Sequence, residues 1–206
     1  MSVTHLATLL QRIPELESCR SALTDAFDVM RICFQSGGKL LLCGNGGSAA
    51  DADHWAGELL KGFGQQRTLR GPDRKGLPPY LARNLQGALP AIPLTGFPAL
   101  ATAFCNDVNP DLVFAQLTSA LGRPGDVLVA LSTSGNARNV CHALATARAR
   151  GLRTIGLTGA SGGRLRRLCD ICIRVPARET YRVQEYHLPI YHCLSLMLED
   201  AFFGSK

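Results

Sequence analysis

Apolar and polar positions along this chain follow two different rhythms. From about residue 6 to residue 34 the apolar side chains recur at helical spacing, and Pro14 suits the first turn of a second helix. After Ser36-Gly37-Gly38 the pattern changes to short, continuous apolar runs, of which 39–43 is the first. Such runs are typical of strands that are buried on both faces of a sheet.

Five of these runs alternate with helical segments. The predicted strands are 39–43, 91–94, 126–131, 154–157 and 171–175. The predicted helices are 49–60, 97–105, 112–121, 137–150, a short helix after Gly162-Gly163, and a long one from about 182 to 202. This alternation predicts an α/β fold with a doubly wound five-stranded parallel sheet flanked by helices. We expect one domain over 1–206, with N-terminal helices in 1–36 and a long C-terminal helix.

Residues 62–88 interrupt the alternation. They are rich in Gly, Pro and Arg and have no periodicity, so we predict an irregular insertion. Much of the net charge of +6 lies around this insertion, because 61–83 holds six basic residues against Asp73 alone. The segment lacks interleaved aromatic residues and a recognition-helix pattern, which disfavours nucleic acid as a partner. Two interpretations stay open: the segment covers a site and attracts an anion through Arg67 and Arg70, or it is a passive surface loop.

The composition, with 46% hydrophobic and 18% charged residues, is typical of a globular protein. No run reaches the ~18 apolar residues of a membrane span, and the first residues do not resemble a secretory leader. Most of the eight cysteines have apolar neighbours, and the single CxxC, Cys169 to Cys172, has no second CxxC to complete a zinc knuckle. We therefore predict a cytoplasmic protein with reduced, buried thiols and no membrane partner.

Two turns that follow predicted strands are suited to binding an anion. Gly44-Asn45-Gly46-Gly47-Ser48 allows close approach of the backbone and directs N–H groups from a helix N-terminus. Ser132-Thr133-Ser134-Gly135-Asn136 adds three hydroxyls and a second helix start. One such turn is weak evidence, but two at the carboxyl ends of strands in an open α/β sheet favour a phosphate site.

A dinucleotide site is a competing interpretation, because Gly44-x-Gly46-x-x-Ala49 resembles part of that fingerprint. It requires an acidic residue ~20 positions further on to hold a ribose hydroxyl. The corresponding stretch, 63–70, has none, and a dinucleotide leaves the serine-threonine turn unexplained. We therefore rank an oxidoreductase below a sugar-phosphate protein.

Candidate chemistry lies on two predicted helices. His54 and Glu58 share a helix face at spacing i, i+4, within reach of one proton or one metal ion. Gln184 and His192 lie on the C-terminal helix, about 12 Å apart along an unbroken helix. They cannot contact one small ion unless the segment around Gln184 is not helical, which Pro189 makes credible, or a second chain completes the site.

These motifs together resemble the phosphoheptose isomerase branch of the SIS (sugar isomerase) proteins, whose fold is flavodoxin-like. The resemblance covers about residue 36 to the C-terminus. It rests on Gly44-Asn-Gly-Gly-Ser-Ala-Ala-Asp-Ala-Asp-His54-x-x-x-Glu58, Asn106-Asp107, Ser132-Thr-Ser-Gly-Asn136, Leu157-Thr-Gly159 and Gln184-Glu-x-His187-x-x-x-x-His192. Gly62, Ala137 and the length of the basic insertion depart from the family pattern, which bears on the substrate more than on the reaction.

The resemblance implies interconversion of sedoheptulose 7-phosphate and glycero-manno-heptose 7-phosphate by a homotetramer with sites between subunits. It implies that Glu58 and His192 are the catalytic base and acid. The residues that it implies for binding substrate and phosphate are Asn45, Gly46, Ser48, Asn106, Asp107, Ser132, Thr133, Ser134 and Gln184. It also implies a zinc ion, with His54, Glu58, Gln184 and His192 as ligands.

Aldose–ketose isomerisation suits these residue types. One base moves a proton between adjacent carbons through an enediol, and one acid serves the carbonyl oxygens. A zinc ion would polarise the carbonyl, although coordination would lower the basicity of Glu58. The alternative is a non-catalytic sugar-phosphate-binding or regulatory SIS protein of the replication-initiator-binding type, against which the presence of Glu58 and His192 argues.

Overall fold

Five parallel strands form the centre of the molecule in the computed structural model, which describes residues 2–69 and 71–204. The strands are β1 (Leu40–Cys43), β2 (Ala91–Pro93), β3 (Val127–Leu131), β4 (Arg153–Thr158) and β5 (Ile171–Arg174). Their order is β2-β1-β3-β4-β5, so the chain leaves β1 toward one edge and returns beside it at β3. The doubly wound parallel sheet is confirmed, and its switch point lies between β1 and β3.

Helices connect and cover the strands, close to the predicted positions. The α-helices are α1 (Ser2–Arg12), α2 (Arg20–Gln35), α3 (Gly47–Leu60), α4 (Pro79–Asn84), α5 (Pro98–Asp107), α6 (Val113–Leu121), α7 (Arg138–Ala149), α8 (Leu165–Leu168) and α9 (Thr180–Phe203), and the 3₁₀ turns are η1 (Pro14–Cys19), η2 (Gly71–Arg74) and η3 (Pro110–Leu112). Within the described ranges no helix is long and apolar enough to cross a membrane. The predicted insertion at 62–88 lies between α3 and β2, but it is not irregular throughout: η2 and α4 form there, the latter with Pro79 at its first position.

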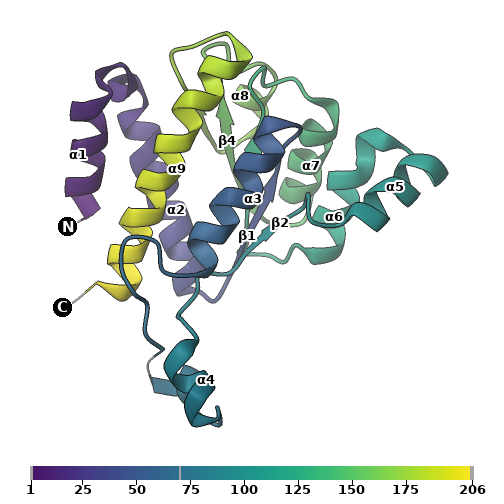
Figure 1. The fold of residues 1–206 in the computed structure, drawn as a ribbon. Helices are drawn as coiled ribbons and strands as arrows, with labels where there is room; N and C mark the ends of the chain where they lie inside the picture. The colour runs from purple at the N-terminus through teal and green to yellow at the C-terminus, as the bar shows by residue number, and fades with distance from the viewer. Residues whose placement is uncertain (1, 70, 205–206) are drawn as a thin grey trace.

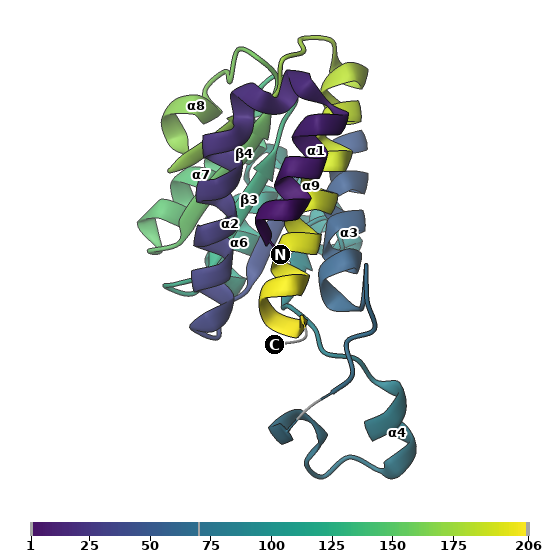
Figure 2. The same cartoon turned by 90° about the vertical axis from the view of Figure 1, so that its left-hand side faces the viewer.

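The side chains of β1 separate two apolar layers. Leu40 and Leu42 pack in the cluster that contains α1, α2, α3 and α9, whereas Leu41 and Cys43 pack in the cluster that contains α6 and α7. This alternation follows from the pleat of the strand, and it explains why the run is apolar at every position. Figures 1 and 2 show the two helical layers on opposite faces of the sheet.

The C-terminal helix is unbroken. Its 24 residues, Thr180–Phe203, include Pro189 in the interior, and it packs against α1, α2 and α3. The predicted long C-terminal helix is confirmed, and of the two options for Gln184 and His192 the non-helical segment is excluded. Val183, Ile190, Leu194 and Leu198 of this helix are fully buried, and this apolar face holds the helix in place despite the hydrogen bond that Pro189 cannot donate.

The insertion between α3 and β2 forms an arm that projects from the body beyond the C-terminal end of α3 (Figures 1 and 2). Its root is fixed by a buried ion pair: Arg67 Nε donates to Glu199 Oε1 at 2.7 Å, and both side chains are almost completely buried. Of the two interpretations of this segment, attraction of an anion by Arg67 is thus wrong, because its charge is neutralised inside the protein. Arg70 lies outside the described residues.

Candidate functional site

The two glycine- and serine-rich turns meet in one pocket of about 340 Å³ at the switch point of the sheet. β1 and β3 are neighbours, with Cys43 opposite Ala130, so the turns that follow them lie side by side. The pocket is lined by Asn45, Gly46, Gly47, Ser48, Leu131, Ser132, Thr133, Ser134, Ala137, Thr180 and Gln184. Seven predicted substrate- or phosphate-binding residues are among them, including Gln184 from the first turns of α9.

Backbone geometry explains the glycines of the first turn. Gly46 has a φ of 55°, in the left-handed region, and precedes the first residue of α3. A Cβ at Gly47 would collide with the side-chain amide of Gln184, so the glycine leaves room for that amide beside the turn. The N-terminus of α3 therefore reaches the pocket. The N–H groups of Ser48 and Ala49 donate to the carbonyl oxygens of Asn45 and Gly46, so it is the positive end of the helix dipole that favours an anion here.

Ser48 and Ser132 form the inner wall of the pocket, with 3% and 5% of their surface exposed. The second turn is shaped by its own polar groups, since Ser134 Oγ accepts from the Asn136 amide at 3.2 Å. The side chains of Asn45 and Asn139 exchange two hydrogen bonds of 2.9 Å. Because Asn139 lies on α7, the helix after the second turn, this pair joins the first turn to α7. The pocket is thus a polar surface with preformed donors.

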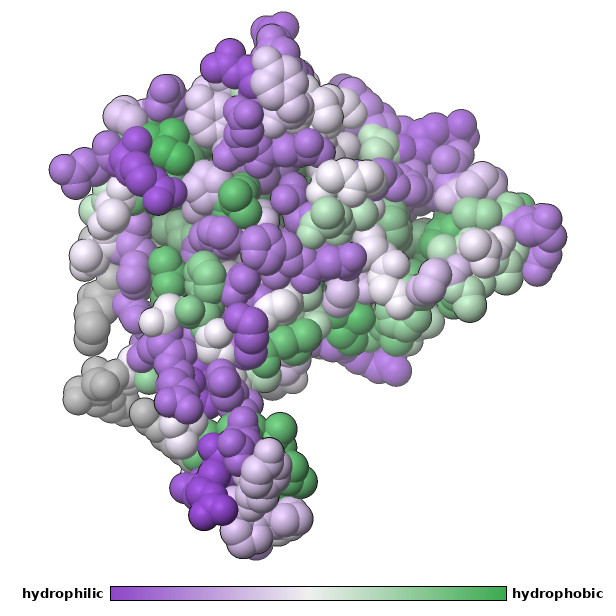
Figure 3. All heavy atoms as spheres, viewed as in Figure 1, coloured by the Kyte–Doolittle hydropathy of each residue, from purple (hydrophilic) through white to green (hydrophobic). Residues whose placement is uncertain are grey.

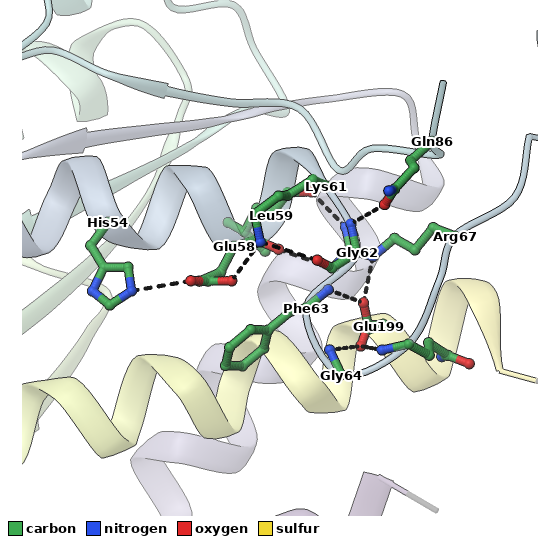
Figure 4. Close-up of polar contacts among 11 residues, drawn as sticks. His54, Glu58, Leu59, Lys61, Gly62, Phe63, Gly64, Arg67, Gln86 and Glu199 are labelled. Carbon is green, nitrogen blue, oxygen red and sulfur yellow. Dashed lines mark hydrogen bonds and ion pairs between the residues drawn. The ribbon is translucent and has the colours of Figure 1, made fainter. Parts of the chain in front are cut away.

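A second group of predicted residues gathers at the other end of α3. His54 Nε2 lies 3.1 Å from Glu58 Oε1, and Lys61 Nζ lies 3.4 Å from Glu58 Oε2 (Figure 4). The ring of His192, on α9, packs edge-on against His54 with 5.2 Å between centroids. His192 Nε2 is buried without a hydrogen-bond partner in the described chain. Burial lowers the pKa of His192, and the neighbouring His54 lowers it further.

These two groups are far apart within one chain. Ser48 and Glu58 are ten residues apart on α3, about 15 Å along the helix axis, and Gln184 and His192 are about 12 Å apart on α9. The pocket around the phosphate turns includes neither Glu58 nor His192. Because α9 is continuous, the remaining option from the sequence is a site to which a second chain contributes.

The predicted zinc ligands fit a metal ion only in part. His54, Glu58 and His192 are near one another, and the unpartnered His192 Nε2 suits a ligand. Gln184, however, contacts the turn at Gly47 instead. Among the residues that the structure describes, no group of three or more His, Cys, Asp or Glu side chains is arranged to hold a metal ion.

Asn106 and Asp107 lie elsewhere, at the exposed C-terminal end of α5, where Asn106 Nδ2 donates to Asp107 Oδ1 at 2.8 Å. α5 has no buried side chain within its ten residues. In Figure 1 it projects from the body, and Figure 3 shows apolar colour over this projection. The structure therefore does not bring these two residues to either group in one chain.

We call His54, Glu58 and His192 the acid–base group. Two residues beside it were not predicted as site residues. Asp51 precedes His54 by three positions and shares its helix face, so helical spacing could have revealed it. Tyr191 adjoins His192 and reads in the sequence as a core aromatic residue. In the structure its hydroxyl lies 2.9 Å from His54 Nδ1 and 3.4 Å from Asp51 Oδ1.

A larger pocket, of about 530 Å³, lies between α2 and the edge strand β5 and is lined in part by Cys19, Asp25, Asp170 and Arg174. It contains neither glycine-rich turn nor any member of the acid–base group. Size alone does not identify a site, and an anion is better served by two helix starts and buried hydroxyls. The smaller pocket therefore matches an anion site better than the larger one does.

Comparisons with known proteins agree with this architecture. The SIS domain family matches residues 99–199. Phosphoheptose isomerase of Rhodospirillum rubrum is 42% identical over 186 residues, covering 90% of this chain and 89% of that protein. The phosphoheptose isomerase of Thiobacillus denitrificans is 46% identical over 171 residues, covering 82% of this chain and 77% of that one.

A solved structure shows the same fold. The phosphoheptose isomerase from Francisella tularensis superposes with a TM-score of 0.79 and 32% identity, over 96% of this chain and 95% of that one. Two relatives are thus more than 40% identical over most of both chains, and a solved relative shares the fold. The chain belongs to the phosphoheptose isomerase family.

Proposed function

We propose that this chain isomerises sedoheptulose 7-phosphate to glycero-manno-heptose 7-phosphate by proton transfer through an enediol. The observation that carries the proposal is the placement of Glu58 beside His54 and His192 in a chain that also forms a phosphate pocket. A carboxylate and an imidazole supply the base and the acid that an aldose–ketose isomerisation requires. The 42% identity to a phosphoheptose isomerase supports this substrate.

The phosphate pocket would hold the unreactive end of the sugar. Ser48, Ser132 and Ser134 line its wall and would donate their hydroxyls, and the positive end of the α3 dipole lies beside them. Each charge-assisted hydrogen bond to a phosphate contributes about 1.5–3 kcal/mol. This binding energy would fix the position of the carbonyl relative to the base.

Glu58 would move the proton and His192 would serve the oxygens. The Glu58 side chain is only 12% exposed, so its carboxylate is shielded from bulk water, and Lys61 and His54 flank its two oxygens. The pKa of His192 is lowered, which makes its imidazolium a stronger acid toward an enediolate oxygen. Both side chains are held on the long, packed helices α3 and α9.

We also propose that the working enzyme is a homotetramer with sites between subunits. A second copy would bring the phosphate pocket of one chain near the acid–base group of another, which the ~12 Å and ~15 Å separations within one chain prevent. Every side chain of α5 is at least partly accessible in the single chain, so this helix offers a surface that another copy could cover. Closed symmetry is the usual form of such assemblies.

Zinc binding is a further part of the proposal. His54, Glu58 and His192 of one chain would hold the ion, and a glutamine such as Gln184 would come from another copy. Imidazole and carboxylate ligands suit zinc, and a bound zinc ion would polarise the substrate carbonyl. Metal content per subunit, measured in the protein and in a His54→Gln variant, tests this part separately from the reaction.

We place the protein in the cytoplasm. All eight cysteines are free thiols, five of them buried, which matches a reducing compartment. A sugar phosphate substrate is consistent with the same location.

Turnover in heavy water tests the reaction. If Glu58 forms an enediol, deuterium should appear on the carbon beside the carbonyl of the product. Glu58→Gln keeps the shape of the side chain but removes the base, so turnover and exchange should both be lost. His192→Asn should lower the rate by ~10²–10⁴, the usual contribution of a positioned acid or base.

A Glu58→Gln variant that isomerises at the parent rate would refute this mechanism. A parent protein that binds the sugar phosphate but exchanges no proton would instead indicate the non-catalytic role. The homologous isomerases and the presence of both Glu58 and His192 argue against that role.

A further inference from the structure

The C-terminal helix begins at the phosphate pocket. Thr180, the first residue of α9, lines this pocket together with Gln184, which follows four residues later on the same face of the helix. Figure 1 shows that α3 and α9 begin at the same end of the molecule, and there α3 contributes Gly47 and Ser48 to the pocket. The starts of two helices that pack against each other therefore bound the pocket.

The hydroxyl of Thr180 is free, in contrast to the other threonine hydroxyls within helices. A threonine that lies at least one turn inside a helix donates here to the carbonyl oxygen four residues earlier, at 2.7 to 3.0 Å; these residues are Thr8, Thr24, Thr102, Thr118 and Thr146. Thr180 has no helical turn before it, and its hydroxyl has no hydrogen-bond partner among the residues that the structure describes. A donor is therefore available at the wall of the pocket.

The backbone at the start of α9 also favours an anion. Glu179, at the N-cap position, makes no side-chain hydrogen bond to the first turn. In the described chain no backbone carbonyl accepts from the N–H groups of Thr180, Tyr181 or Arg182. The first N–H groups of a helix have no acceptor within it, and they form the positive end of its dipole. The Thr180 hydroxyl thus lies where negative charge is stabilised.

Two buried serines indicate a ligand in the same pocket, independently of the helix ends. Ser48 and Ser132 line the pocket and are almost completely buried, yet neither hydroxyl has a hydrogen-bond partner in the part of the chain that the structure describes. Buried polar groups in folded proteins are normally hydrogen-bonded. A phosphate group, with its strong acceptor oxygens, would accept from these hydroxyls and from Thr180 together.

We infer that Thr180 is a further phosphate-binding residue, whose hydroxyl donates to the substrate phosphate from α9 while Ser48 and Ser132 donate from the two turns. This inference rests on the proposed function, in which the phosphate of the sugar occupies this pocket. The phosphate takes no part in the proton transfer, so the contact stabilises the bound substrate and the transition state equally. Its loss should therefore raise KM and leave kcat unchanged.

Two variants of Thr180 separate the hydroxyl from the packing of the side chain. Thr180→Val keeps the branched shape but removes the hydroxyl, whereas Thr180→Ser keeps the hydroxyl and removes a methyl group. Thr24→Val is the matched control, because Thr24 lies outside the pocket, on α2, and its hydroxyl donates to the Arg20 carbonyl oxygen at 3.0 Å.

Calorimetric titration with inorganic phosphate gives a readout that needs no turnover. We expect Thr180→Val to bind phosphate about tenfold more weakly than the parent, because it loses one charge-assisted hydrogen bond. Thr180→Ser and Thr24→Val should bind within twofold of the parent. With the sugar phosphate as substrate, KM should rise about tenfold in Thr180→Val while kcat changes less than twofold.

An unchanged affinity for phosphate in Thr180→Val would overturn the inference, as would an equal loss of affinity in Thr180→Ser or a fall in kcat at constant KM. Ser132→Ala separates this failure from that of the proposed function. If Ser132→Ala weakens phosphate binding and Thr180→Val does not, the pocket is correct and only the role of Thr180 fails. If both variants bind phosphate as the parent does, the proposed location of the phosphate fails as well.

Discussion

Single serines, at the residue scale, illustrate how burial prepares a binding site. Ser48 and Ser132 are almost inaccessible at the wall of the phosphate pocket, so packing already restricts their side chains before an anion arrives. Ordering in advance lowers the entropy that binding must overcome. The contribution of each hydroxyl should therefore be visible in affinity.

Ser132→Ala should weaken binding of the sugar phosphate by tenfold or more, since it removes one charge-assisted hydrogen bond of about 1.5–3 kcal/mol. Isothermal titration calorimetry with Glu58→Gln as background measures binding without turnover. Ser36→Ala, at an exposed serine after α2, is the control and should bind as the parent does. An unchanged affinity in Ser132→Ala would contradict the location of the phosphate.

His187 predicts how stability responds to pH. It is fully buried on α9, and burial lowers its pKa to about 4, an effect that the nearby backbone of Thr158 opposes only in part. Its pKa in the unfolded chain is about 6.5. Between these two values the unfolded state binds the proton and the folded state does not, so stability falls as the pH falls through this window.

From pH 7 to pH 5 this histidine should reduce the free energy of unfolding by about 2 kcal/mol. His187→Leu should remove this dependence of the unfolding free energy on pH. His142→Leu, at a partly exposed position of α7, should leave it unchanged. Urea unfolding at both pH values and at fixed protein concentration gives the comparison. Equal slopes in the parent and in His187→Leu would show that His187 has a polar partner in the folded enzyme.

At the scale of elements, the arm and α9 are joined by one buried carboxylate. Glu199 accepts hydrogen bonds from the backbone amides of Phe63, Gly64 and Gln65 and from Arg67 (Figure 4). Burial would raise the pKa of Glu199, but these donors outweigh burial and lower it. Arg67 also donates to the carbonyl oxygens of Leu59 and Glu58, so the end of α3 is tied to α9 through this pair.

Arg67→Leu should therefore destabilise the fold, because it leaves part of the Glu199 charge buried without a partner. Removal of one member of a buried ion pair typically costs about 3–5 kcal/mol. Arg74→Leu, in the exposed η2 turn, should have little effect. Thermal unfolding at low and high salt provides the measurement, and a buried pair predicts a loss in Arg67→Leu that salt does not change. An unfolding temperature equal to that of the parent would contradict this structural role.

At the scale of the whole molecule, the separation between the phosphate pocket and the acid–base group is the dominant feature. The proposed homotetramer predicts a mass near four subunits in light scattering, whereas a shared site alone requires at least two copies. It also predicts complementation between inactive variants. Gly47→Leu, whose side chain would collide with Gln184, blocks the pocket, and Glu58→Gln removes the base.

When these two proteins are unfolded together and refolded as mixed oligomers, activity should return to about a quarter of the parent rate, since each half of a shared site is intact in one chain of two. Oligomers of either variant alone should stay inactive. A mixture without activity would show that pocket and base act within one chain, and a fully active monomer would defeat the proposal of a tetramer.

The sequence by itself determined the sheet, the turns and the helices that bear the polar residues. Strands such as β1 are apolar at each position, and helices such as α3 repeat their apolar positions with a helical period. Both patterns involve residues close together in the sequence, so the sequence alone predicts these elements. The pairing of the two turns in one pocket also followed from the sequence, because parallel strands place their carboxyl ends at one edge.

Only the tertiary structure decided the environment of each charged or polar side chain. Arg67 is basic and lies in a loop-like stretch, yet Glu199, 132 residues further on, holds it inside the protein. Tyr191 looks like a core residue, yet its hydroxyl reaches His54 on another helix. The continuity of α9 through Pro189 was likewise undecided until its packing against α1, α2 and α3 was known. The burial of a side chain, the pairing of charges and the set of residues in a site all depend on contacts between distant segments. Local sequence patterns do not specify which distant segments meet.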